Sequence, residues 1–220
     1  MKNVTIQTSP DKRIENAVRK AIQIYLSRIY NKFYEIGLED TFKLYLGNII
    51  ATELELNTFS PTERFFVMFE KNMPINNHND YVDIVIKYKN QNVIKLYPIE
   101  LKFKKITDSA PDLGNLVSYI DIYNLDRHKA ITKNVCGCYY IFMTDLETYT
   151  KKSFKGTRTE IPMHDGYTIQ KNKSYTVSGA TAKKNLAKYP NGLIFNNDYT
   201  IEYEKVIIDK KPYWYYILKL

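Results

Sequence analysis

The fold of this chain is decided by the stretch YVDIVIKYKNQNVIKLYPIELKFK, residues 81–104. Two runs rich in β-branched and aromatic residues, 81–88 and 93–103, flank the turn-forming segment Lys89-Asn90-Gln91-Asn92. We therefore expect an antiparallel hairpin in which residue 88 pairs with residue 93. This register brings Asp83 opposite Pro98.

Three ionisable side chains, those of Asp83, Glu100 and Lys102, interrupt this apolar hairpin. Side chains alternate along a strand, so Glu100 and Lys102 share one face, and Asp83 is a diagonal neighbour of Glu100 on that face. Diagonal side chains start about 7–8 Å apart, so both carboxylates can converge on one small divalent ion.

Mg²⁺ usually takes only one or two carboxylates and keeps its other positions for water and phosphate. A lysine beside a ligating glutamate can polarise the attacking water, so the pattern predicts metal-assisted phosphodiester hydrolysis. The alternative is a charged strand edge that faces solvent.

Helices and strands are expected on both sides of this hairpin. Ser9-Pro10 is a favourable helix start, and apolar residues then recur with a 3.6-residue period as far as Ile29. The further expected elements are a helix at 40–54, a strand at 64–70, a helix at 112–129 and a strand at 135–143. In the helix at 112–129, the side chains expected to face the sheet are Leu113, Leu116, Val117, Ile120 and Tyr123, and those expected to face outward are Asp121, Asp126 and Arg127. The order predicts an α/β fold with a mixed central β-sheet flanked by helices.

This order of elements, with Asp83 and Glu100-Leu101-Lys102 in these places, resembles the PD-(D/E)xK nuclease superfamily over roughly residues 10–145. The resemblance implies a restriction-endonuclease-like core. It also implies that Asp83, Glu100 and the Leu101 main-chain carbonyl bind the metal, and that Lys102 is the catalytic lysine. Val82 departs from the pattern, because it stands where the family name has proline.

Other acidic residues compete for a place in this site. Asp80, three residues before Asp83, is the rival for the aspartate role. Many members of the superfamily add a glutamate from the first helical region. The candidates for this additional acid are Glu15, Glu39, Glu53 and, on the strand at 64–70, Glu70. For each of them the simpler interpretation is a solvated surface charge.

The positive charge of the chain is concentrated in its C-terminal third. The formal net charge is +8, of which residues 1–150 carry +1 and residues 151–220 carry +7. We expect a nuclease-like core at 1–150 and, at 151–220, a basic, aromatic-rich β extension packed on it as one structural unit. An excess of Lys and Arg favours a phosphate backbone as partner, although solubility or genome composition would also produce it. The basic loop residues expected to contact DNA are Lys151, Lys152, Lys155 and Arg158.

The extension is expected to hold two hairpins and a short helix. The first hairpin joins residues 167–170 to 174–177, and the last joins 199–208 to 213–220. A short basic helix is expected at 182–189. Together these elements predict a second β-rich layer or lobe.

Several other classes of protein are disfavoured. The chain has no GxxxxGK[ST] or GxGxxG loop, no HExxH motif and no Cys/His set with zinc spacing. It has no secretory signal pattern and no apolar run of about 18 residues, so we expect a soluble, cytoplasmic protein without a membrane partner.

Within the superfamily the chain looks most like a type II restriction endonuclease. That resemblance implies a prokaryotic or phage-encoded enzyme that cleaves double-stranded DNA with Mg²⁺, for which Mn²⁺ substitutes. It also implies a homodimer and a cognate DNA methyltransferase encoded nearby. The alternatives are a repair, junction-resolving, phage or defence nuclease, a non-enzymatic DNA-binding module with the same fold, and an RNA-directed nuclease or nucleotide-activated effector.

Overall fold

The computed structural model describes residues 9–35, 37–75, 79–105, 111–153 and 157–220. The elements of the first half are α1 (Pro10–Tyr30), α2 (Glu39–Leu56), β1 (Glu63–Asn72), β2 (Tyr81–Asn90), β3 (Val93–Lys104), α3 (Pro111–Ile131) and β4 (Tyr139–Thr144). The elements of the second half are η1 (Glu147–Tyr149), α4 (Thr157–Glu160), β5 (Thr168–Ile169), β6 (Ser174–Tyr175), α5 (Ala180–Asn185), β7 (Leu193–Ile194), β8 (Tyr199–Thr200), β9 (Glu204–Ile208) and β10 (Lys211–Lys219).

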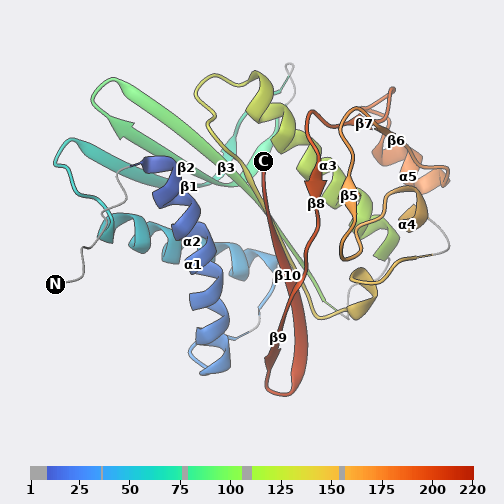
Figure 1. The fold of residues 1–220 in the computed structure, drawn as a ribbon, viewed down its shortest axis with the longest axis horizontal. Helices are drawn as coiled ribbons and strands as arrows, with labels where there is room; N and C mark the ends of the chain where they lie inside the picture. The colour runs from blue at the N-terminus through green and yellow to red at the C-terminus, as the bar shows by residue number, and fades with distance from the viewer. Residues whose placement is uncertain (1–8, 36, 76–78, 106–110, 154–156) are drawn as a thin grey trace.

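One six-stranded mixed sheet forms the centre of the molecule, in the order β1-β2-β3-β4-β10-β9. Only the β3–β4 pair is parallel among these neighbours, because α3 crosses between the two strands. Helices α1 and α2 lie together on one side of the sheet, while α3 and residues 157–203 lie on the other (Figure 1). The predicted α/β class and mixed sheet are therefore confirmed.

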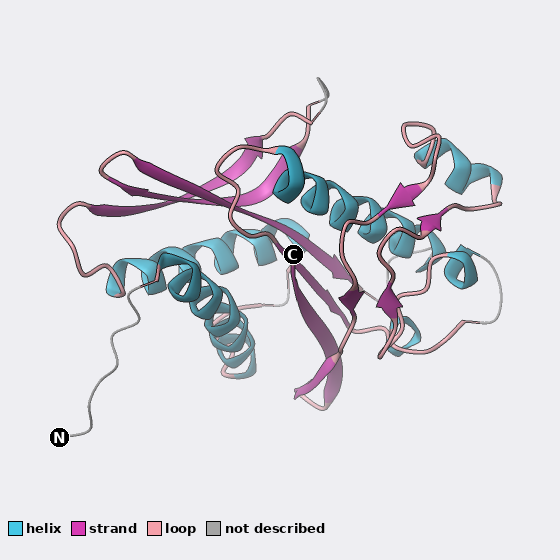
Figure 2. Ribbon diagram, turned by 45° about the horizontal axis from the view of Figure 1, so that its top comes forward, coloured by secondary structure: helices cyan, strands magenta, loops and turns pink. Residues whose placement is uncertain are grey.

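Two apolar clusters hold these layers together. The first joins the inner faces of α1 and α2 to the sheet and includes Ile22, Phe42 and Leu101. The second joins α3 and the C-terminal segments to the opposite face and includes Tyr119, Phe142 and Phe195. Alternate side chains of β4 enter opposite clusters, as the two-residue period of a strand requires, and the same period places Ile99, Leu101 and Phe103 of β3 in the first cluster. Figure 2 shows α3 beside the short strands β5 to β8, away from α1 and α2.

The register of the β2–β3 hairpin differs from the prediction by two positions. The turn consists of Gln91 and Asn92, Gln91 has a φ of 51°, and the last pair before it is Asn90↔Val93. At the other end the ladder stops at Ile84↔Ile99, so the expected pairing of residue 83 with residue 98 is wrong. A shift of two keeps every side chain on its predicted face. Asp83 and Glu100 therefore stand opposite each other, directly beyond the last pair.

The C-terminal segment contributes to two layers. Strand β10 pairs with β4 and β9, so the last hairpin completes the central sheet and does not belong to a second layer. The expected hairpin at 167–177 is wrong, because β5 pairs with β8 and β6 pairs with β7. The expected helix at 182–189 forms earlier, as α5. These distant pairings carry no local signal in the sequence.

Helix α3 is covered on two sides, by the sheet and by residues 157–203. This overturns part of the expected pattern: Leu113 is exposed, and Asp126 is buried, where it accepts hydrogen bonds from the Tyr199 hydroxyl and the Asn196 backbone N–H. Asp121 keeps only 20% of its side chain exposed and faces the sheet. The one-sided amphipathic pattern assumed for this helix does not apply when protein covers both faces.

Candidate active site

The acidic pair of the hairpin lies where β2 and β3 separate. The ladder ends at Ile84↔Ile99, so the Leu101 backbone N–H donates to Asp83 Oδ2 at 2.9 Å. Glu100 and Lys102 point to the α3 side of the sheet, while Leu101 packs into the cluster on the other side. The predicted Asp83, Glu100 and Lys102 are therefore brought together at one end of the sheet.

Lys102 is held between two carboxylates from two different helices. Its Nζ donates to Glu39 Oε1 at 3.0 Å and lies 3.7 Å from Asp121 Oδ2. The second oxygen of Glu39 accepts a hydrogen bond from the Phe103 backbone N–H at 3.0 Å. Glu39 is the first residue of α2, so the start of that helix fixes the position of the lysine.

A second lysine, Lys43, joins the site from the next turn of α2. Its side chain is almost fully buried and its ammonium contacts Glu70, Asp40 at 3.2 Å and Asp83 Oδ1 at 3.5 Å. Glu70 has a φ of 49° and interrupts the β1–β2 ladder opposite Asp83. Lys43 therefore holds the outer oxygen of Asp83, while Leu101 holds the inner one.

The acids of this site repel one another. Burial raises the pKa of Glu100 well above its usual value, and the Asp121 and Asp83 carboxylates raise it further. Burial also raises the pKa of Asp121, to about 7, against the opposing effect of Lys102 and with a further contribution from Asp83. Both shifts have the sign expected for carboxyl groups that lack enough compensating positive charge.

In the two lysines of the site, nearby carboxylates affect the pKa more strongly than burial does. Burial by itself lowers the pKa of Lys102, but the carboxylates of Asp121 and Glu39 outweigh it and raise the pKa above its usual value. The same holds for Lys43, where Glu70, Asp83 and Asp40 outweigh burial. Both side chains are therefore ammonium groups at neutral pH.

Within the described ranges, no three acidic, histidine or cysteine side chains form a ready-made metal centre. The two lysines hold Glu39 and Glu70 in ion pairs. The chemistry of the donor set still fits one divalent cation, because Asp121 Oδ2 is buried without a hydrogen bond and the pKa of Glu100 is raised by its acidic neighbours. A cation would relieve this repulsion, and Mg²⁺ needs no more than one or two carboxylates.

Of the remaining acidic candidates, some lie in or next to the site and others lie elsewhere. Glu39 lies in the site, and Glu70 reaches it through Lys43. Glu53 pairs with Lys20, and Glu15 pairs with Lys219, so neither contacts this cluster. Asp80 is engaged elsewhere, because its two oxygens contact Asn124 at 3.2 Å and His128 at 2.8 Å.

The basic loop after β4 is partly tied to its own backbone and side chains. Lys151 pairs with Glu147 at 2.8 Å, and the Arg158 guanidinium donates to the carbonyls of Thr148 and Lys151. Lys152 is exposed, and Lys155 lies outside the described residues. Their assignment to DNA binding stays a prediction.

Two members of this site, Asp121 and Lys43, were missed from the sequence. Asp121 was expected on the outer face of α3, and Lys43 was not among the predicted site residues. A usable signal existed for Lys43, because it follows Glu39 by four residues and so shares its helix face. No comparable signal exists for Asp121, because the pairing of α3 with the sheet brings it to Lys102.

Comparisons with known proteins add no relative. No family model matches the chain, and no curated protein and no solved structure matches it. Over the residues that the structure describes, no helix is both long enough and apolar enough to cross a membrane.

Proposed function

We propose that this protein is a metal-dependent endodeoxyribonuclease with a PD-(D/E)xK-type, restriction-endonuclease-like core. The observation that carries the proposal is the position of Lys102, 3.0 Å from Glu39 and 3.7 Å from Asp121, beside the Asp83–Glu100 pair. A charged strand edge in solvent does not explain why two acids from two different helices, Glu39 and Asp121, flank a largely buried lysine. Perturbed acids gathered around one such group are typical of functional sites.

The groups that would hold the metal are the carboxylates of Asp83 and Glu100 and the carbonyl of Leu101, with Asp121 as an additional acid. An extended residue projects its N–H and C=O to the same side, and the Leu101 N–H points at Asp83. Bound Mg²⁺, or Mn²⁺ in its place, would polarise the phosphate and lower the pKa of a bound water.

Lys102 acts as a cation and a hydrogen-bond donor in this scheme. Its raised pKa keeps the ammonium protonated, so it orients the attacking water or stabilises negative charge that develops on the phosphate. It does not serve as the general base while Glu39 and Asp121 are ionised. Glu39 is a positioning residue, because it holds Lys102 and the Phe103 backbone together.

The proposed substrate is double-stranded DNA. The support is the +7 balance of residues 151–220, which is suited to a phosphate backbone. Among nucleases of this type we favour a sequence-specific type II restriction endonuclease, acting as a cytoplasmic homodimer with a cognate methyltransferase. A repair, junction-resolving or defence nuclease would use the same site.

The second candidate is a non-enzymatic DNA-binding module that keeps the fold. The buried acids disfavour it, because unscreened carboxylates repel DNA and give a pure binding protein no benefit. Metal dependence separates the two, since a nuclease requires the ion and a module of this kind does not.

The decisive experiment is digestion of methylated and unmethylated phage DNA by the purified protein with Mg²⁺. Lys102→Ala and EDTA should abolish cleavage, and Lys89→Ala should not, because Lys89 is an exposed lysine at the far end of β2. Discrete bands support a sequence-specific nuclease, and a smear supports a non-specific one. Intact DNA in every lane, together with a gel shift, would overturn the enzyme in favour of the binding module.

A further inference from the structure

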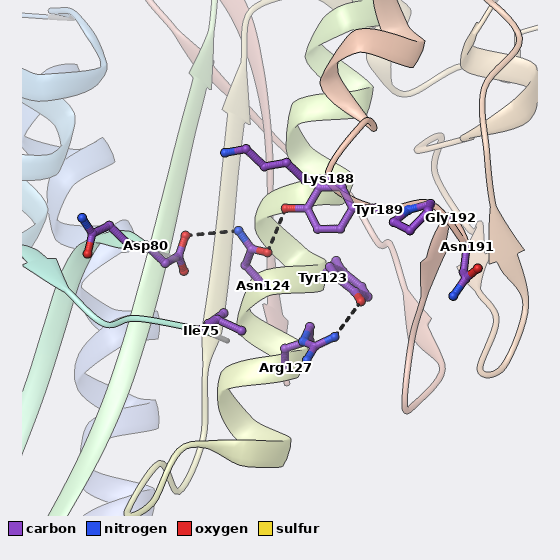
Figure 3. A pocket seen from close by; sticks show the side chains of 11 residues that line it. Ile75, Asp80, Tyr123, Asn124, Arg127, Lys188, Tyr189, Asn191 and Gly192 are labelled. Carbon is purple, nitrogen blue, oxygen red and sulfur yellow. Dashed lines mark hydrogen bonds between the residues drawn. The ribbon is translucent and has the colours of Figure 1, made fainter. Parts of the chain in front are cut away.

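A cavity of about 270 Å³ lies between α3, the segment before β2 and residues 188–192. Figure 3 shows its walls, with Asp80 and Asn124 on one side and Tyr189 and Asn191 on the other. Its volume is close to the lower end of the range for small-molecule pockets, roughly 300–1,000 Å³. Pockets also concentrate where two structural layers meet, as the core and the C-terminal layer do here.

The cavity adjoins the candidate active site along two elements. Asp80 precedes Asp83 by three residues, and Asn124 follows Asp121 by three residues on α3. Three residues rise about 10 Å along an extended chain and about 4.5 Å along a helix. A strand of nucleic acid bound at the acidic pair can therefore reach the cavity within one or two nucleotides.

Two tyrosine rings form part of the wall. Tyr123 from α3 and Tyr189 from the C-terminal layer meet edge to face, with ring centroids 5.3 Å apart. Tyrosine rings beside a nucleic-acid path are suited to stacking on a base, because every base presents a π-face.

Asn124 connects the two layers across the cavity. Its Nδ2 donates to Asp80 Oδ1, and its Oδ1 accepts from the Tyr189 hydroxyl, both at 3.2 Å (Figure 3). A carboxylate only accepts hydrogen bonds, so Asp80 fixes the orientation of the amide. Tyr189 is thereby held in place before any ligand binds.

Two cationic side chains at the cavity have no acidic partner in the described part of the chain. Among the residues that the structure describes, Arg127 donates to the Tyr123 hydroxyl, at 3.1 Å, and its Nε is buried without a hydrogen bond. Lys188 is exposed at the rim. The one acid of the wall, Asp80, is already bonded to Asn124 and His128. The cavity therefore combines aromatic rings with two cationic side chains against one carboxylate, and this excess of positive charge suits an aromatic ligand that carries an anion.

We propose that this cavity binds a single unstacked nucleotide, with its base against Tyr123 and Tyr189 and its phosphate at Arg127 and Lys188. This inference rests on the proposed nuclease function, because the nucleotide is then part of the DNA strand that lies across Asp83 and Glu100. Removing a base from a duplex stack costs the free energy of unstacking and unpairing, which stacking on tyrosine and charge pairing offset. A free mononucleotide presents the same chemistry.

The first arm of the test measures binding of the four deoxynucleoside 5′-monophosphates to the full chain in EDTA, where no cleavage occurs. The second arm uses duplexes with 2-aminopurine at successive positions, whose fluorescence rises when the base leaves the stack. Both arms compare wild type with Lys188→Ala, Tyr189→Phe and Arg127→Met. Lys184→Ala is the matched control, because it removes the same charge from an exposed site on α5, outside the cavity. Thermal melting checks that each variant is folded.

We expect Lys188→Ala and Arg127→Met to weaken nucleotide binding about tenfold or more and to lower the 2-aminopurine signal, with Lys184→Ala unchanged. Tyr189→Phe should give a smaller loss, because it keeps the ring but releases it from Asn124. Nucleotide binding that depends on these residues supports the proposed nucleotide site even if no DNA is cleaved. Failure of the nuclease proposal can therefore be distinguished from failure of the nucleotide-site proposal. Binding in the first arm alone identifies a free nucleotide as the ligand. No binding in either arm, or equal losses in Lys184→Ala, would overturn the proposal.

Discussion

The carboxylate of Glu39, the first residue of α2, lies 3.0 Å from the ammonium of Lys102, near the end of β3. The two residues are 63 positions apart in the chain. The other oxygen of Glu39 accepts a hydrogen bond from the Phe103 N–H, so both carboxylate oxygens are held in place. The position of α2 on the sheet therefore determines the position of the lysine on which the proposed chemistry depends.

Replacing Glu39 tests which of the candidate glutamates belongs to the site. Glu39→Gln keeps a hydrogen-bond acceptor but removes the charge that helps to raise the pKa of Lys102. We expect cleavage to fall about tenfold or more, with an altered pH profile, because the lysine is less firmly held and less strongly protonated. Glu15→Gln is the control, since Glu15 pairs with Lys219 and Arg19. Equal activity of the two variants at all pH values would exclude Glu39 from the site.

The raised pKa of Asp121 predicts how stability depends on pH without metal. The folded protein keeps the Asp121 proton up to about pH 7, whereas the unfolded chain loses it near pH 4. The folded state thus binds more protons between these values, so this group lowers the free energy of unfolding as pH rises from about 4 to 7. Asp121→Asn removes the effect, and its stability relative to wild type should increase over that range.

Urea unfolding in EDTA at several pH values measures this difference. Asp209→Asn is the control, because it removes one exposed carboxylate from the β9–β10 turn, outside the cluster. A stability difference between Asp121→Asn and wild type that does not change with pH would contradict the prediction.

Removing Lys43 should have opposite effects on metal binding and on stability. Its ammonium lies 3.5 Å from Asp83 Oδ1 and competes with any cation there. Lys43→Met should bind Mg²⁺ at least about fivefold more tightly in calorimetric titration, since a neighbouring positive charge is gone. The metal-free variant should unfold at lower urea, because Asp83 and Glu70 lose their partner. Lys20→Met, which removes a lysine paired with Glu53, should leave Mg²⁺ affinity unchanged. An unchanged affinity in Lys43→Met would place the metal away from Asp83.

A buried ion pair away from the site stabilises the packing of α1 against β1. The Arg13 guanidinium donates to both oxygens of Glu63, at 2.9 and 2.7 Å, and the Tyr88 hydroxyl donates to Glu63 at 3.0 Å. Arg13→Met would leave a buried carboxylate without its cation, so we expect a loss of about 3–5 kcal/mol in the free energy of unfolding. Arg19→Met removes an exposed pair and should cost at most about 1 kcal/mol. Similar losses in both variants would mean that burial does not decide the strength of the Arg13 pair.

The parts of the fold that follow from local pattern were predictable. Ser9-Pro10 starts α1 where expected, and the expected hairpin and the helix that follows it appear as β2, β3 and α3. The shared face of Glu100 and Lys102 follows from strand alternation alone. The two-residue error in register had no effect on faces, because side chains repeat every two residues.

The parts that depend on distant segments were not predictable. Each of the short strands β5 to β8 pairs with a strand that is distant in the sequence, and every β10–β4 pair joins residues at least 70 positions apart. Asp126 was expected in solvent but is buried, because Asn196 and Tyr199 from the C-terminal layer cover it. Helix periodicity reports which residues share a face and does not report how many faces are covered.

The sequence by itself determined the helices α1, α2 and α3, the hairpin and the face that carries Asp83, Glu100 and Lys102, because these depend on backbone periodicity and turn chemistry over a few residues. Only the tertiary structure decided that Glu39 and Asp121 flank Lys102 and that Lys43 contacts Asp83. It also decided that residues 188–192 close a cavity against α3. The physical reason is that side chains from separate elements meet only when apolar burial packs those elements together, and that packing depends on the whole chain.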